Sequence, residues 1–239
     1  MDIKVRHLLL TIIVFAILSI SCDNVSTKVD PDADTSNLGD VTYIARDPDG
    51  GLKTIAFADT LIDSDSILIY RELGIDVVWE MEVFFRKSPW EPLYMRVFSE
   101  TIQGELLWNG GRVTGDAIDE NGVSQSIDKS ISGLSIHAWF LQAAFLGFPF
   151  GNESVHLEFQ MITPQLSDFP YRADYSGTEG VATNSKWFNC HKLEVDGRGI
   201  YSPFTPDVRV FYRVTEPHIP IQLWVQNEGA VFEWFADSL

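Results

Sequence analysis

The pentapeptide Gly133-Leu134-Ser135-Ile136-His137 is the stretch of this 239-residue chain that comes nearest to a catalytic motif. It approaches the nucleophile elbow Gly-x-Ser-x-Gly, in which a serine sits on a sharp strand-to-helix turn of an α/β sheet. His137 stands where the second glycine belongs, and no strand–helix–strand alternation surrounds it. Glu80 and Glu82 could act as paired carboxylates in acid–base chemistry, but the outer face of a half-buried strand accounts for both. We therefore expect no catalytic residue, and a protein that is not an enzyme.

Metal-ligating side chains are spread along the chain without ligand spacing. The histidines are His7, His137, His156, His191 and His218, and they form no His-x-His or His-x-x-x-His pair. Asp30, Asp32 and Asp34 begin like a calcium loop. Thr35 then replaces the glycine of such a loop, and Val41 replaces its bidentate glutamate. The spacing therefore predicts no metal site and no cofactor.

The first 21 residues have the features of an export signal. Lys4 and Arg6 precede an apolar run of 13 residues, from Leu8 to Ile20. Such a run is typical of a secretory signal and is shorter than the roughly 20 residues that span a membrane. Ser19-Ile20-Ser21 then precedes Cys22, which resembles a bacterial lipoprotein signal with Cys22 as the lipidated first residue of the mature chain.

The residues before Cys22 leave two other outcomes open. Lipoprotein signals prefer Leu, Val or Ile three residues before the cysteine, and Ser19 occupies that place. Ser19 and Ser21 also suit an ordinary signal peptidase, which would cut the same bond without adding lipid. An uncleaved anchor is the third alternative. In each case we expect an exported protein that faces the periplasm or the cell exterior, held at the membrane by its N-terminal lipid in the first case.

Charge and composition describe the rest of the chain. It has 17 Lys+Arg against 34 Asp+Glu, a formal charge of −17. Such an acidic chain repels phosphate backbones, so we expect no nucleic-acid partner. After the predicted signal peptide 1–21, residues 22–40 are polar and acidic and read as a flexible tether. A tether of about 18 residues would reach roughly 20–25 Å. Residues 41–239 are predicted to form a single antiparallel β domain.

Short alternating segments predict the fold of that domain. Met81, Val83 and Phe85 point to one face of a strand, while Glu80 and Glu82 point to the other. Asn- and Gly-containing turns such as Asn109-Gly110-Gly111 separate runs of this kind. We therefore expect a mainly β protein with one curved antiparallel sheet, as a half-barrel or open barrel.

The segment 135–146 has a different pattern, because it is apolar nearly all round and ends at Gly147 and Pro149. It predicts one short helix. A helix without a polar face must be enclosed, so we place it on the concave side of the sheet. There it would either roof an apolar cavity or fill the core.

The order of these segments resembles a known family. The helix ends in Leu146-Gly147-Phe148-Pro149-Phe150-Gly151, a later strand carries the pair His191-Lys192, and Ile219-Pro220-Ile221 lies in a late strand. This order is similar to the exported bacterial family named domain of unknown function 3108, over roughly residues 54–235. The resemblance implies a fold related to the lipoprotein-carrier (Lol-type) half-barrels, in which a curved sheet encloses helices and an apolar cavity. It carries over no catalytic residue.

Aromatic residues suggest where a ligand could bind. The candidate cavity residues are Trp139, Phe140, Phe145, Trp187, Tyr212 and Trp224. They could line an apolar cavity for a lipid or a lipoprotein acyl chain, or they could simply be packed core. The expected function is an envelope lipoprotein that binds or carries a hydrophobic ligand. The alternative is a non-catalytic structural or interaction module of the envelope, whose protein partner the sequence does not identify.

Cys190 is the one cysteine that remains if Cys22 is acylated. The simpler interpretation is a small apolar core side chain. The alternative is a reactive thiol or one that pairs between molecules, although no Cys-x-x-Cys motif supports it.

Overall fold

A computed structural model describes residues 41–238 except 48–49, 152–154, 184–185 and 228–229. The predicted signal peptide 1–21, the tether 22–40 and the lipidation candidate Cys22 lie outside the described residues.

The described strands form a single 15-stranded sheet. They are β1 (Val41–Arg46), β2 (Leu52–Ile62), β3 (Asp65–Gly74), β4 (Trp79–Lys87), β5 (Trp90–Ser99), β6 (Gln103–Asn109), β7 (Arg112–Ile118), β8 (Ser124–Ser130), β9 (Ser135–His137), β10 (His156–Ile162), β11 (Asp168–Ala182), β12 (Trp187–Gly197), β13 (Asp207–Arg213), β14 (Pro220–Asn227) and β15 (Ala230–Ser238). Two 3-10 segments, η2 (Ala138–Phe140) and η3 (Gly199–Phe204), and one α-helix, α2 (Leu141–Ala144), complete the described elements.

Strands that follow one another in sequence pair side by side, from β1 to β8 and from β9 to β15. The first and last described strands, β1 and β15, also pair, with Ala45 opposite Ala236, so the two halves join in the middle of the sheet. The edges of the sheet are β8 and β9, which follow one another in the chain. The sheet is therefore curled like a barrel that remains open at one seam, between β8 and β9.

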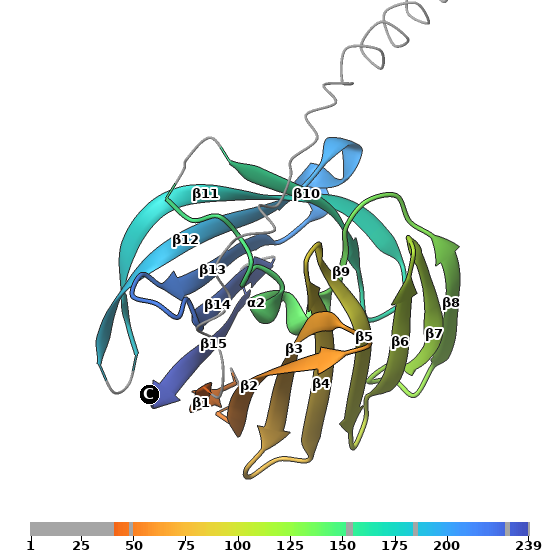
Figure 1. Cartoon of the computed structure of the whole chain (residues 1–239), viewed down its shortest axis with the longest axis horizontal. Coiled ribbons are helices and arrows are strands. Elements are labelled where there is room, and N and C mark those ends of the chain that lie inside the picture. Colours follow the sequence, from red (N-terminus) through yellow and green to blue (C-terminus); the bar gives the residue numbers. More distant parts are fainter. Residues whose placement is uncertain (1–40, 48–49, 152–154, 184–185, 228–229, 239) are drawn as a thin grey trace, which may run out of the picture.

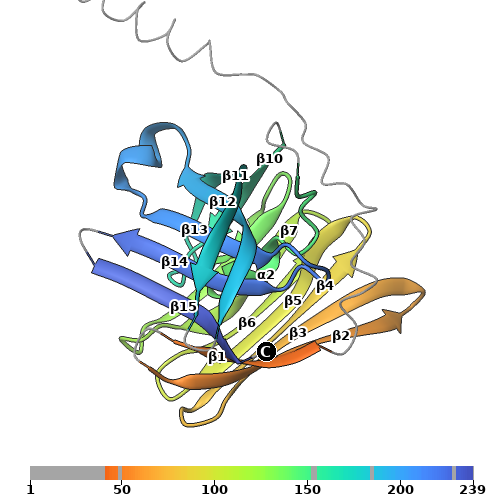
Figure 2. The same cartoon turned by 90° about the vertical axis from the view of Figure 1, so that its left-hand side faces the viewer.

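The sheet curls around α2. Figures 1 and 2 show α2 between the β1–β8 half, coloured orange to green, and the β10–β15 half, coloured teal to blue. The predicted fold class is confirmed: the protein is mainly β, with one curled antiparallel half-barrel sheet and, among the described residues, a single short α-helix.

Alternation along each strand separates the interior from the outer face. In β4, Met81, Val83 and Phe85 are fully buried, whereas Glu80 and Glu82 face outward. Because successive side chains point to opposite faces of a sheet, the apolar set of each strand packs around α2.

The predicted helix over 135–146 is too long. Ser135–His137 is the short strand β9, which runs parallel to β10 with Met161 opposite Ile136. The Nδ1 atom of His137 then accepts a hydrogen bond from the backbone N–H of Trp139, at 3.2 Å, and η2 begins. The α-helical part is only the four residues of α2, and all four are buried. The helix is enclosed, as its composition predicts, but β9 adds a parallel pair to an otherwise antiparallel sheet.

Candidate binding site

A buried carboxylate connects α2 to the sheet. Glu72 on β3 is 2% exposed. It accepts hydrogen bonds from Gln142 Nε2 of α2 at 2.5 Å and from Trp79 Nε1 at 2.9 Å, and a third from the Tyr70 hydroxyl. Burial, and then the neighbouring Glu72, raise the pKa of Tyr70 well above its usual value. The Tyr70 hydroxyl therefore stays protonated and acts as a donor.

Lys53 supplies the opposite charge. Its Nζ atom lies 3.5 Å from Glu72 Oε2 and 2.6 Å from Asp47 Oδ2, and it stands 3.8 Å from the ring centroid of Trp79. A buried charge is tolerated when it is paired and hydrogen-bonded. Because the neighbouring groups use the oxygens of Glu72, this cluster positions α2 and offers no free acid or base.

The predicted cavity residues Phe140, Phe145 and Tyr212 are packed core. Phe140 is fully buried and meets Phe85 edge-on, with ring centroids 5.5 Å apart. Tyr212 donates from its hydroxyl to the carbonyl of Gln142 at 2.6 Å, and the same hydroxyl accepts the N–H of Phe145 at 3.3 Å. Burial raises the pKa of Tyr212. These three residues hold α2 in place.

The other three predicted cavity residues lie apart from one another. Trp139 is partly buried, and its ring lies 3.3 Å from where a Cβ on Gly104 would stand. Trp224 is partly buried, 4.5 Å from the guanidinium of Arg209. Trp187 is 69% exposed on the outer side of β12, where its ring covers Gly180. The structure thus brings three of the six residues together around α2 and does not join all six in one cavity; Trp187 does not face the interior.

Ser135 is held by a structural hydrogen bond, whereas His137 is bonded at Nδ1 and its buried Nε2 has no hydrogen-bond partner among the described residues. The Ser135 hydroxyl accepts a hydrogen bond from Trp108 Nε1 at 2.8 Å. His137 is fully buried, and burial lowers its pKa to about 3. Its imidazole is therefore neutral at pH 7. Nothing in the described structure aligns these two residues as nucleophile and base.

Two histidines that the sequence separates come together beside Phe150. The rings of His191 and His218 lie 5.1 Å apart, and Phe150 stacks on His191 at 4.7 Å. Tyr175 hydrogen-bonds His191 Nδ1 at 3.1 Å. Burial, and then the nearby His218, lower the pKa of His191 to about 4. Sequence spacing could not reveal this pair, because the register of β12, β13 and the loop before β14 brings it together.

Cys190 is fully buried, and burial raises the pKa of its thiol to about 12. A thiol in this state is a poor nucleophile at neutral pH, so the core interpretation describes Cys190. Among the described residues, no group of three or more His, Cys, Asp or Glu side chains is placed to hold a metal ion.

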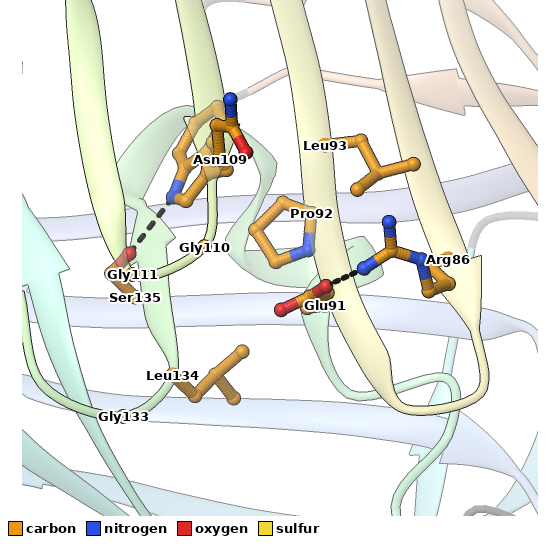
Figure 3. A pocket seen from close by; sticks show the side chains of 11 residues that line it. Arg86, Glu91, Pro92, Leu93, Asn109, Gly110, Gly111, Gly133, Leu134 and Ser135 are labelled. Carbon is orange, nitrogen blue, oxygen red and sulfur yellow. Dashed lines mark hydrogen bonds and ion pairs between the residues drawn. The ribbon is translucent and has the colours of Figure 1, made fainter.

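A small pocket lies between β5, the β6–β7 turn and the start of β9 (Figure 3). It has a volume of about 70 Å³ and is lined by Arg86, Glu91, Pro92, Leu93, Trp108, Asn109, Gly110, Gly111, Gly133, Leu134 and Ser135. The guanidinium of Arg86 donates to Glu91 and, at 2.9 Å, to Asp65. A space of this size holds a few water molecules. The pocket is too small for an acyl chain. Its cationic group, the Arg86 guanidinium, is already paired with the carboxylates of Glu91 and Asp65.

A larger groove lies at one end of the β3–β8 strands, where three neighbouring hairpins turn. This rim groove has a volume of about 630 Å³ and is lined by Ile75, Asp76, Val77, Val78, Ser99, Glu100 and Thr101. A second hollow of about 450 Å³ follows it, between the ends of the β5–β6 and β7–β8 hairpins. The three turns lie along the lower edge of the molecule in Figure 1.

Apolar side chains are exposed along this rim. Ile75 is 53% exposed, Val78 50% and Phe98 45%. Leu73, Val77, Ile118 and Val123 are exposed on the same hairpin ends. The rim groove is shallow and open, and its lining combines the apolar Ile75, Val77 and Val78 with four polar residues. It is the candidate binding site because these apolar side chains are exposed there. The signal in the sequence is the set of three apolar residues Ile75, Val77 and Val78 at a turn, where polar residues are usual.

Comparisons with known proteins identify no family. No family model matches the chain, and no curated protein matches it. Among solved structures, a β-barrel-like protein of domain of unknown function DUF1849 from Brucella abortus is similar at 8% identity and a TM-score of 0.45, over 83% of this chain and 94% of that chain. A "putative lipoprotein" from Parabacteroides distasonis ATCC 8503 is similar at 8% identity and a TM-score of 0.31, over 83% and 93% of the two chains. The resemblance to domain of unknown function 3108 and to Lol-type half-barrels stays a prediction.

In the part of the chain that the structure describes, no helix has the length and apolar character needed to cross a membrane.

Proposed function

We propose that this protein is a non-catalytic envelope lipoprotein that binds a hydrophobic ligand in the rim groove. The observation that carries the proposal is the cluster of exposed Ile75, Val77 and Val78 over a groove of about 630 Å³. Exposed apolar patches on folded proteins commonly mark ligand or partner sites. Among the described residues, Phe140, Phe145 and Tyr212 pack around α2, and we place the ligand at the rim of the sheet, where apolar side chains are exposed.

Export and anchoring support an envelope role. The signal-like residues 1–21, Cys22 and the acidic segment 22–40 favour a chain that is lipidated and held at a membrane surface. Cys22→Ala should move the protein from the membrane fraction to the aqueous fraction. Unchanged partitioning would contradict an acyl anchor at Cys22.

The ligand test is native mass spectrometry of the full chain, purified from membranes in a mild detergent and incubated with a phospholipid mixture. Val77→Ser and Val78→Ser together should reduce the lipid-bound fraction at least five-fold, because they remove the apolar floor of the rim groove. Leu61→Ser is the matched control, since Leu61 is 75% exposed at the opposite end of the strands. Lipid retention that is equal in wild type and the double variant would overturn the rim-groove proposal, as would no lipid adduct on the wild-type protein.

A second function, an interaction module of the envelope, is favoured by a different surface: the outer face of strands β2–β6.

A further inference from the structure

An apolar row crosses the outer face of five neighbouring strands. The row follows the strand register from β2 to β6 and consists of Ala58, Ile69, Phe84, Tyr94 and Leu107. The rings of Phe84 and Tyr94 lie 5.5 Å apart, and Leu107 is 49% exposed. We call this row the outer stripe.

The outer stripe faces away from α2. Its neighbours along the strands, Tyr70, Val83 and Met95, are fully buried in the core. Because adjacent side chains in a strand alternate between faces, Ile69, Phe84 and Tyr94 point outward. A sheet face of an isolated domain usually carries polar side chains on its solvent side, so an apolar row here indicates a surface that is covered at least part of the time.

A row of alternating charge runs beside the outer stripe, two residues further along each strand. It consists of Arg71, Glu82, Arg96 and Glu105, on β3, β4, β5 and β6 in that order. Within the chain, Arg71 Nε lies 2.5 Å from Glu82 Oε1. The signs along the row are plus, minus, plus, minus.

Read in the opposite direction, the row has the signs minus, plus, minus, plus. A second copy with its strand order reversed would therefore place an opposite charge against each charge of the row. A two-fold axis parallel to the strands, between β4 and β5, would lay the outer face of one copy on that of another with the strand order inverted. Glu82 would then face Arg96 of the second copy, and Arg71 would face the second Glu105. The same axis lays Phe84 on the second Tyr94, and Ile69 on the second Leu107. An interface of this kind is isologous, as in most homodimers.

We propose that the outer stripe is the docking surface for a second copy of this chain, in an aligned packing of two sheets. The charge pattern favours this occupant over a membrane surface, because the row has no net charge and anionic lipids would meet a chain of formal charge −17. The dimer proposal does not depend on the rim groove or on the ligand proposed for that groove.

The size of the surface sets the strength of the dimer. The outer stripe crosses five strands and the charged row crosses four. With strands about 4.8 Å apart and each row taking up about 7 Å along the strands, the two rows cover roughly 300 Å² of sheet per copy. Standard interfaces bury about 800 Å² per partner. The dimer is therefore weak and dependent on concentration, which suits molecules held close together on a surface.

The experiment is a charge swap followed by sedimentation velocity. The full chain, purified in a non-ionic detergent, is measured from about 1 µM to 1 mM with correction for bound detergent. Wild type should shift from monomer to dimer over this range. Glu82→Arg places like charges opposite Arg96 of the second copy, and Arg96→Glu places like charges opposite Glu82. Each variant alone should dimerise at least ten-fold more weakly.

An equimolar mixture of the two variants gives the decisive result. In a mixed dimer the new Arg at position 82 faces the new Glu at position 96, so the mixture should recover dimerisation to within about three-fold of wild type. Phe84→Ser should weaken the dimer without changing any charge, and Glu158→Arg on β10 is the control that leaves it intact. Thermal melting of each variant checks that it is folded.

Three results would overturn the proposal: a wild-type protein that stays monomeric to 1 mM, single swaps that dimerise like wild type, or folded swap variants whose mixture fails to recover. Binding of phospholipid vesicles through Phe84 by a monomeric protein would assign the stripe to a lipid surface and would equally overturn it.

Discussion

At the scale of single residues, Glu72 is a buried carboxylate whose hydrogen bonds connect α2 to the sheet. It is an ionisable side chain in a β interior, 2% exposed, and donors from the sheet and from α2 surround it. Removing Glu72 takes the acceptor from the buried donors of Tyr70, Trp79 and Gln142, and a buried donor that loses its partner is costly. The sequence could not single out Glu72, because its strand also carries the exposed Arg71 and nothing local separates the two.

Glu72→Ala should lower the free energy of unfolding by about 3–5 kcal/mol. The change leaves Lys53 with Asp47 as its remaining acidic partner in the cluster and removes an acceptor from Gln142 and Trp79. Urea unfolding followed by tryptophan fluorescence measures the loss. Glu80→Ala, on the outer face of β4, is the control and should change stability by less than about 0.5 kcal/mol. Equal effects of the two substitutions would contradict a structural role for the buried carboxylate.

At the scale of elements, the strands are predictable from sequence and their neighbours are not. The alternation in Met81, Val83 and Phe85 predicts the inner face of β4, and the structure confirms it. The apolar segment 135–146 predicts a helix, and its first three residues, Ser135–His137, are not helical. Pairing with β10, which is distant in sequence, makes these residues a strand instead. The outer stripe and the rim groove depend on register between strands, and a single strand does not encode that register.

A substitution at Gly115 tests how closely β6 and β7 approach each other. It has a φ of +150°, and a Cβ added there would stand 2.0 Å from the carbonyl oxygen of Glu105. Gly115→Ala should therefore lower the free energy of unfolding by about 2–4 kcal/mol, through a clash with backbone that cannot move aside. Gly110 has a φ of +56° with open space around it, so Gly110→Ala should cost only about 1 kcal/mol.

Thermal unfolding of the two alanine variants gives the comparison directly. If Gly110→Ala proves the more damaging of the two, the described packing of β6 on β7 is incorrect.

At the scale of the whole molecule, one pairing holds the two halves of the sheet together. β1 joins β15 through Ile44, Ala45 and Arg46, and β15 joins β14. The two remaining edges, β8 and β9, do not pair. Side chains cross the open seam: Trp108 of β6 donates to Ser135 of β9, and Lys129 of β8 pairs with Asp168 of β11. Fold class could be predicted from local pattern, but this closure joins residues from the two ends of the described chain and leaves no local signal.

A chain that ends at Asn227 should lose its cooperative unfolding transition. Without β15, the facing edges of β1 and β14 lose their partner, and unpaired edges associate with other chains. Circular dichroism during heating and light scattering at about 10 µM measure the two effects. A chain that ends at Asp237 keeps most of β15 and is the control. A truncated protein that stays monomeric and melts like the control would show that the two halves hold together without this strand.

The pairing of the first strand with the last also governs when the protein can fold. Contacts between residues so distant in sequence form slowly, because the chain must first close a long loop. If the chain crosses a membrane with its N-terminus first, β1 emerges well before its partner β15. Until then one edge of β1 is unpaired and open to other chains. The closing step of folding therefore follows the emergence of β15, and a holding chaperone that recognises extended strands would act during that interval.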